Sequence, residues 1–175
     1  IFCSNFGVEY GAGISHYGLS PGGAIHDNRI YYNDSVDSGA GIAVQTELPK
    51  NPDCTSNTAT ITSCRGAGSG AVKIDRNLIQ GNFSGDDGGG IFVSDSFTQP
   101  VNIRNNQVVD NGAADMGGAI TLDDAANARV INNTVANNVS TGSSENSAVG
   151  VPHAAGLAAE ANEPLFQATL PAGSP

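Results

Sequence analysis

Short apolar runs and glycine-rich or asparagine-rich positions follow one another along the chain with a repeating pattern. A glycine-rich block followed by a short apolar segment occurs four times, at residues 11–14, 39–44, 88–93 and 117–122. Each block has a partner element with the pattern aliphatic-x-x-Asn-x-aliphatic-x-x-Asn, which begins at Ile25, Ile74, Ile103 and Val130. The internal spacing is identical in all four copies, so each copy is one turn of a repeat architecture.

The repeat predicts strands rather than helices. Alternate residues of a strand point to the same side, so Ile42 and Val44 face one way and Ala43 faces the other. One asparagine of each partner element faces inward at the same place and hydrogen-bonds along the stack: Asn28, Asn77, Asn106 and Asn133. We therefore predict an all-β chain, a right-handed parallel β-helix of about four coils over residues 1–142.

One interval between the glycine blocks is longer than the others and contains an insertion at residues 46–69. Cys54 and Cys64 lie in it, and a disulfide between them would close the loop and indicate an oxidising compartment. The alternative is two unpaired thiols in a cytosolic loop. Cys3 is left over, and it pairs upstream of this segment or stays free.

The repeat ends near residue 142. We expect residues 143–175 to form a loop or interruption, with a short helical turn near Ala158, that leads to further sequence not included here. The chain is therefore expected to be a segment of a larger protein or assembly.

Composition excludes several classes of protein. The 23 glycines and the absence of tryptophan are unlike a helical bundle or coiled coil, because glycine and asparagine are poor helix formers. The formal net charge of −10 argues against nucleic acid as a partner. No apolar run reaches the ~20 residues that a membrane-spanning helix needs.

The Asn-x-[Ile/Val]-x-x-Asn…Gly-Ile-x-Val pattern resembles the repeats of the pectin-lyase-like β-helix superfamily, which includes carbohydrate-binding and sugar-hydrolase proteins. Gly-Gly-Ala-Ile at 22–25 and 117–120, with Val-x-x-Asn at 108–111 and 135–138, also resembles the passengers of polymorphic outer-membrane autotransporters. Either resemblance covers about residues 7–140 and implies the architecture. Neither specifies an activity, because one fold hosts many functions.

Three aspartates occupy the same place in successive copies: Asp37, Asp86 and Asp115. We expect them to stack, and three neighbouring carboxylates are a calcium-type ligand set. Asp34 and Asp87 would add oxygens. The alternative is that these residues only form turns, since aspartate before glycine is a favoured turn former. Apart from this calcium site, we predict no cofactor.

A second acidic set follows the first strand of each coil: Glu47, Asp95, Asp123 and Asp124. Paired carboxylates at one edge would suit acid–base cleavage of a glycan. The alternative is a row of solvated turn acids. No arginine or lysine recurs beside them, although a lyase usually needs a basic residue as proton acceptor.

The sequence therefore favours a rigid scaffold or binding segment over an enzyme. We expect it to lie outside the cell, in the periplasm or at the cell surface, and to bind a polysaccharide or a surface partner. A polysaccharide lyase or glycoside hydrolase with an acidic outer cleft is the alternative.

Overall fold

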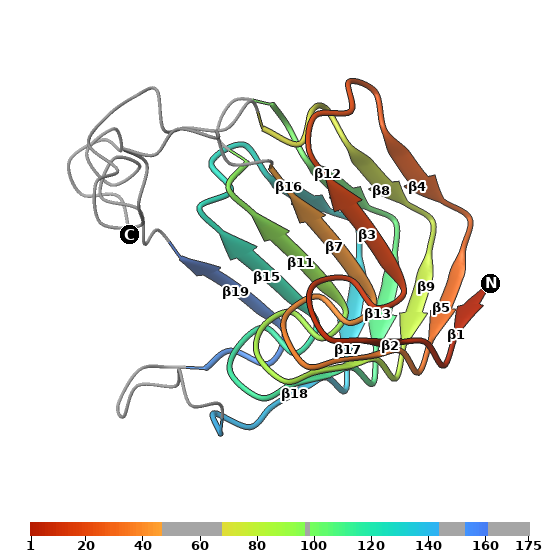
Figure 1. Ribbon diagram of the computed structural model, residues 1–175, viewed down its shortest axis with the longest axis vertical. Helices are drawn as coiled ribbons and strands as arrows, with labels where there is room; N and C mark the ends of the chain where they lie inside the picture. The colour runs from red at the N-terminus through yellow and green to blue at the C-terminus, as the bar shows by residue number, and fades with distance from the viewer. Residues whose placement is uncertain (47–67, 97–98, 144–152, 161–175) are drawn as a thin grey trace.

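The computed structural model describes residues 1–46, 68–96, 99–143 and 153–160, and its regular structure in these ranges is entirely β. The strands form four parallel sheets that run side by side along one stack of coils (Figure 1). This confirms the predicted all-β parallel β-helix. The described residues include no helix of the length and apolar character that a membrane crossing requires.

Each sheet takes one strand from successive coils. The first sheet contains β1 (Phe2–Cys3), β5 (Arg29–Tyr31), β9 (Leu78–Gln80), β13 (Gln107–Val109) and β17 (Thr134–Ala136). The second contains β2 (Phe6–Gly7), β6 (Asp34–Ser35), β10 (Phe83–Ser84), β14 (Gly112–Ala113) and β18 (Val139–Ser140). The third contains β3 (Ile14–Tyr17), β7 (Ile42–Gln45), β11 (Ile91–Ser94), β15 (Ile120–Asp123) and β19 (Leu157–Glu160). The fourth contains β4 (Ala24–His26), β8 (Lys73–Asp75), β12 (Asn102–Arg104) and β16 (Arg129–Ile131).

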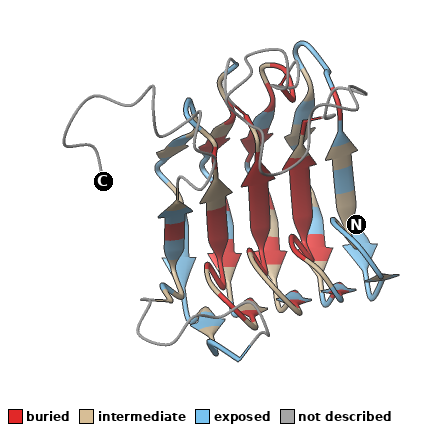
Figure 2. Ribbon diagram, turned by 60° about the vertical axis from the view of Figure 1, so that its left-hand side comes forward, coloured by how far each residue is buried: buried red, intermediate tan, exposed pale blue. Residues whose placement is uncertain are grey.

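The register of the sheets stacks equivalent aliphatic residues inside the solenoid. Ile42 pairs with Ile91, and Ile91 with Ile120, along the third sheet. These side chains are fully buried in one apolar cluster with the valines and isoleucines of the other sheets. Burial is greatest in the central coils and falls toward both ends of the stack (Figure 2). The apolar positions of the repeat thus form the core.

The outer face of the third sheet is also largely covered. Phe92 is only 4% exposed although it points away from the core, and Ala43 and Thr121 are fully buried. The turns before the strands fold over this face, so a Cβ on Gly88 would lie 2.9 Å from the Phe92 Cβ, and one on Gly117 would lie 1.9 Å from Thr121 Oγ1. Glycine is required at both positions because their φ angles are also positive, +59° and +60°.

An asparagine ladder joins the coils at the turn between the fourth and first sheets. Asn77 donates its backbone N–H and its Nδ2 to Asn106 Oδ1, at 2.9 and 3.0 Å. Asn28 bonds Asn77 in the same way, and Asn106 bonds Asn133. Each inner Nδ2 also donates to a backbone carbonyl, as Asn106 does to Ile74 O at 2.9 Å. The buried amides are therefore satisfied along the stack.

A second ladder lies at the turn between the first and second sheets. It consists of Asn5, Asn33, Asn82, Asn111 and Asn138, joined by the same pair of hydrogen bonds at each step. The residue before each rung has a positive φ, as in Tyr32 and Asp110, so both turns are tight left-handed corners.

The segment near Ala158 and the insertion after β7 were also the subject of predictions. The helical turn expected near Ala158 is wrong, because Ala158 lies in β19, which pairs with β15. Cys54 and Cys64 lie outside the described residues, and so does most of the insertion. At the base of the insertion, the Gly68 N–H donates to Thr46 Oγ1 at 2.9 Å. Cys3 is an exposed free cysteine.

Candidate functional site

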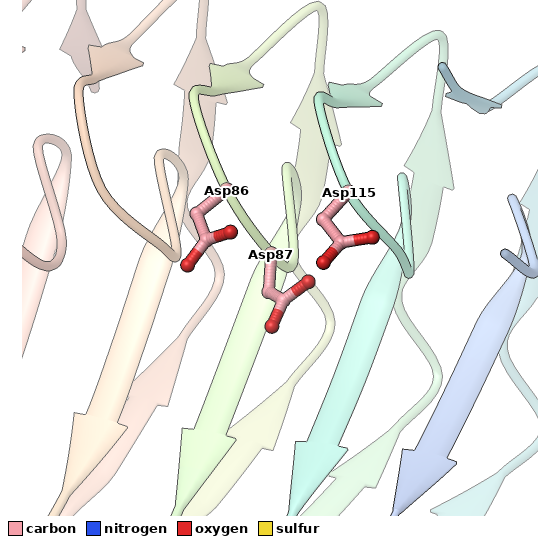
Figure 3. Close-up of side chains that lie close together, drawn as sticks. All are labelled: Asp86, Asp87 and Asp115. Atoms are coloured by element: carbon pink, nitrogen blue, oxygen red, sulfur yellow. The ribbon is translucent and has the colours of Figure 1, made fainter. Parts of the chain in front are cut away.

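Three carboxylates meet at the turns that lead into the third sheet. Asp86 and Asp87 follow β10, and Asp115 follows β14 in the next coil. One oxygen from each lies within 4.8 Å of the others, and Figure 3 shows the three side chains next to one another on two successive turns. The Met116 backbone N–H donates to the Asp87 side chain, at Oδ1, over 3.1 Å and links the two turns.

The cluster differs from the predicted calcium set in its members. Asp86 and Asp115 come together, and Asp87 supplies the third carboxylate. Asp37 is not part of the cluster, and its Oδ1 accepts the Ser38 N–H at 2.8 Å. Asp34 lies on β6, exposed and outside the cluster. Of the three equivalent aspartates, Asp86 and Asp115 therefore belong to the close group.

A histidine adjoins this cluster. His153 Nδ1 lies 2.6 Å from Asp115 Oδ1, and the side chains are 18% and 6% exposed, respectively. The contact does not have hydrogen-bond geometry, so this buried nitrogen has no hydrogen-bond partner in the described part of the chain. Asp86, Asp87, Asp115 and His153 together are called the turn site below.

The carboxylates of the turn site repel one another. Burial raises the pKa of Asp87 to about 7, and the negative charges of Asp86 and Asp115 add to that rise. The hydrogen bond from the Met116 amide acts in the opposite direction. A bound cation would remove this repulsion, because it favours the charged form of every neighbouring carboxylate.

The donor set fits a divalent transition metal. Carboxylate oxygens alone are typical of calcium and magnesium sites, whereas an added imidazole nitrogen suits zinc, copper or nickel. His153 Nδ1 is the nearby nitrogen, and it contacts Asp115. The turn site therefore holds three clustered carboxylates, with an imidazole beside one of them, Asp115.

A groove of about 550 Å³ lies on the outer face of the third sheet. A row of polar side chains from neighbouring strands lines it: Tyr17, Gln45, Ser94 and Asp123. These residues lie in one row because Tyr17 pairs with Gln45, and Ser94 with Asp123, in the register of the sheet. The wall of the groove includes Tyr10, whose ring stacks on Phe92 with the centroids 5.9 Å apart and the planes at 10°.

Two of the four predicted catalytic acids line the groove. Asp95 and Asp123 both line it, and the Asp95 N–H donates to the Asp123 carbonyl at 3.1 Å. Burial raises the pKa of Asp123 to about 8, with further contributions from Asp124, Glu160 and Asp95. Asp124 is 3% exposed and does not line the groove. Glu47 lies outside the described residues.

Some residues of both sites were not predicted. His153 follows the end of the repeat, so periodicity gave no reason to place it beside Asp115. Glu9 and Tyr10 lie in the first-coil turn that corresponds to Asp37 and Ser38 in the next coil, but the sequence pattern assigned no role to either residue. The glycine-rich block before the apolar segment of each repeat copy was the available signal, because it allows the preceding turn to approach the sheet.

Comparison with known proteins gives one family. Residues 7–153 match the family model described as "Periplasmic copper-binding protein (NosD)", a range that includes the whole turn site. Searches of the curated proteins and of the solved structures each returned no match. The family is periplasmic, which agrees with the predicted location.

Proposed function

Because the chain belongs to the NosD family of periplasmic β-helix proteins, we propose that it holds a copper ion at the turn site. The observation that carries this proposal is the buried His153 nitrogen, 2.6 Å from an Asp115 oxygen and without a hydrogen-bond partner among the described residues. A nitrogen in that position would exchange its contact with Asp115 for a metal that the same carboxylate binds.

The copper proposal replaces calcium as the expected ion. Three carboxylates alone would favour calcium, whereas the imidazole shifts the preference toward copper, which also leads the affinity order of the divalent first-row metals. In the proposed site the clustered carboxylates of Asp86, Asp87 and Asp115 would provide oxygen ligands, and the ring of His153, which contacts Asp115, would have to shift toward the cluster to add the nitrogen. The bound ion would neutralise the repulsion among the carboxylates.

The fold supports this role by holding the turns rigidly. Asp86 and Asp115 lie on neighbouring coils, and the Asp115 N–H donates to the Asp86 carbonyl at 3.0 Å. The asparagine ladders fix the spacing of the same coils on the other side of the solenoid. A scaffold of this kind keeps ligands from different coils in place before the metal arrives.

Calorimetric titration of the whole chain with copper(II), zinc and calcium tests the proposal. We expect copper to bind most tightly and His153→Ala to weaken copper binding by at least about tenfold. His26→Ala is the matched control, because His26 is exposed and contacts Asp27 instead. Copper binding that is unchanged in His153→Ala, or calcium binding that is tighter than copper binding, would contradict the proposal.

We propose glycan binding as a second function, located in the groove of the third sheet. The stacked pair of Tyr10 and Phe92 supports it, because Tyr10 presents an aromatic face that is 38% exposed beside a polar row of side chains. Affinity electrophoresis through gels that contain neutral, cationic or acidic polysaccharides measures this binding. A retarded protein is expected, and equal mobility in every gel would contradict the proposal.

The enzymatic alternative uses the same groove. Asp95 and Asp123 would then act as an acid–base pair, and Asp123, with its pKa near 8, would be the proton donor. Incubation with polysaccharides would release new reducing or unsaturated ends. If no ends form while binding persists, the groove is a binding surface.

A further inference from the structure

The charges of this chain are segregated by sheet. The described lysine and arginine residues lie on the first and fourth sheets or on the turn between them: Arg29, Lys73, Arg76, Arg104 and Arg129. None of these lies on the third sheet, which carries the groove. Lys50 and Arg65 fall outside the described residues.

The groove itself is acidic and aromatic. Three carboxylates line it, from Glu9, Asp95 and Asp123, and no described lining residue is basic. Tyr10 and Tyr17 add aromatic surface, with exposed fractions of 38% and 64%. Gln45 and Ser94 add neutral hydrogen-bonding groups to the floor. The lining thus offers negative charge, aromatic faces and hydrogen bonds in one place.

The negative field extends over the aromatic wall. Burial raises the pKa of the Tyr10 hydroxyl, and the charges of Asp37, Asp86, Glu9 and Asp95 raise it further. The tyrosine therefore sits among carboxylates from three coils. An anionic ligand would meet repulsion at Glu9 and Asp95, whereas a cation would be attracted both to these acids and to the ring faces.

We propose that the groove binds a cationic amino glycan, an oligosaccharide whose rings carry protonated amines. A sugar ring stacks on Tyr10, and its ammonium groups pair with Asp95 and Glu9. This rests on the proposed glycan-binding function and names the ligand class. It excludes the uronate polymers that would suit a basic groove.

Calorimetry with four ligands of similar length tests this inference on the whole chain. The ligands are a glucosamine trimer, its fully N-acetylated counterpart, a galacturonate trimer and spermidine. We expect the glucosamine trimer to bind at least about tenfold more tightly than the other three, and to weaken as salt rises because its charges are screened.

Variants separate the two recognition elements. Asp95→Asn should lower the affinity for the glucosamine trimer about tenfold and leave the affinity for the N-acetylated trimer unchanged. Asparagine tolerates the φ of +54° at this position. Tyr10→Leu should lower the affinity for both trimers. Asp110→Asn is the matched control, because Asp110 lies on the turn after β13, contacts Gln80 and does not line the groove.

Each outcome separates the inference from the proposed function. Equal affinity for the glucosamine and N-acetylated trimers would overturn the cationic preference and leave glycan binding standing. Spermidine binding as tight as the glucosamine trimer would overturn sugar recognition. Failure of every ligand to bind would overturn both.

Discussion

The asparagine ladder is expected to be a main source of stability, and Asn106 is its most informative member. Its side chain is 1% exposed and makes four hydrogen bonds. It accepts two from Asn77, donates one to Ile74 O and donates one to Asn133 Oδ1. Asn106→Ala removes all four and leaves the buried Asn77 N–H without its acceptor.

The expected decrease in the free energy of unfolding follows from these hydrogen bonds. Each hydrogen bond contributes about 1 kcal/mol net, so four amount to about 4 kcal/mol. Urea unfolding followed by circular dichroism measures it, and a slope of about 2 kcal/mol/M would place the midpoint about 2 M lower. Gln107→Ala is the control, since Gln107 is exposed and outside the ladder, and its effect should stay within about 0.5 kcal/mol.

A second substitution gives a graded test. Asn133 is only partly buried, and its side chain accepts from Asn106 and donates to Ile103 O. This side chain accepts two hydrogen bonds and donates one, so Asn133→Ala should cost about 3 kcal/mol, less than Asn106→Ala. A loss below about 1 kcal/mol for Asn106→Ala, with an unchanged slope, would refute the view that the ladder stabilises the stack.

Three further predictions concern stability. Gly89→Ala should destabilise the protein strongly in urea unfolding, because the new Cβ would lie 2.0 Å from the Gly112 carbonyl oxygen. Gly22→Ala is the control: its Cβ would meet nothing within 4 Å, and it should cost only about 1 kcal/mol because the φ of Gly22 is positive. Stability should fall as pH rises from about 4 to about 8, because the pKa of Asp123 is raised to about 8 in the folded state, and Asp123→Asn should reduce that slope. Asp27→Asn should leave the urea midpoint nearly unchanged, because the ion pair of Asp27 with Arg76 is exposed and asparagine tolerates the φ of +55° at this position, and a clearly lower midpoint would contradict this.

Periodic features of the fold were predictable from the sequence because each coil imposes the same physical demand. The inward isoleucines and the first asparagine ladder follow from fixed spacing. The second ladder uses the last asparagine of the same motif, but that position was not assigned a structural role. Its role depends on a left-handed turn that brings Asn82 and Asn111 together, and the pattern does not state this.

Features that depend on contacts outside the repeat could not be predicted. Leu157–Glu160 consists of good helix formers, yet it forms β19 because pairing with β15 outweighs local propensity. Phe92 is buried on the outer face under the turns of its own and the preceding coil, and Tyr10 of the first coil stacks on its ring. His153 reaches Asp115 from the segment where the repeat has already ended. In each case the deciding partner is distant in sequence and has no periodic signature.

The most direct test of the proposed copper site is an anomalous difference map at the copper absorption edge, from crystals of the copper-loaded protein. The account predicts one strong peak within ligand distance of His153 Nδ1 and the carboxylates of Asp86, Asp87 and Asp115. A strong peak at His16 or His26, with none at the turn site, would contradict it.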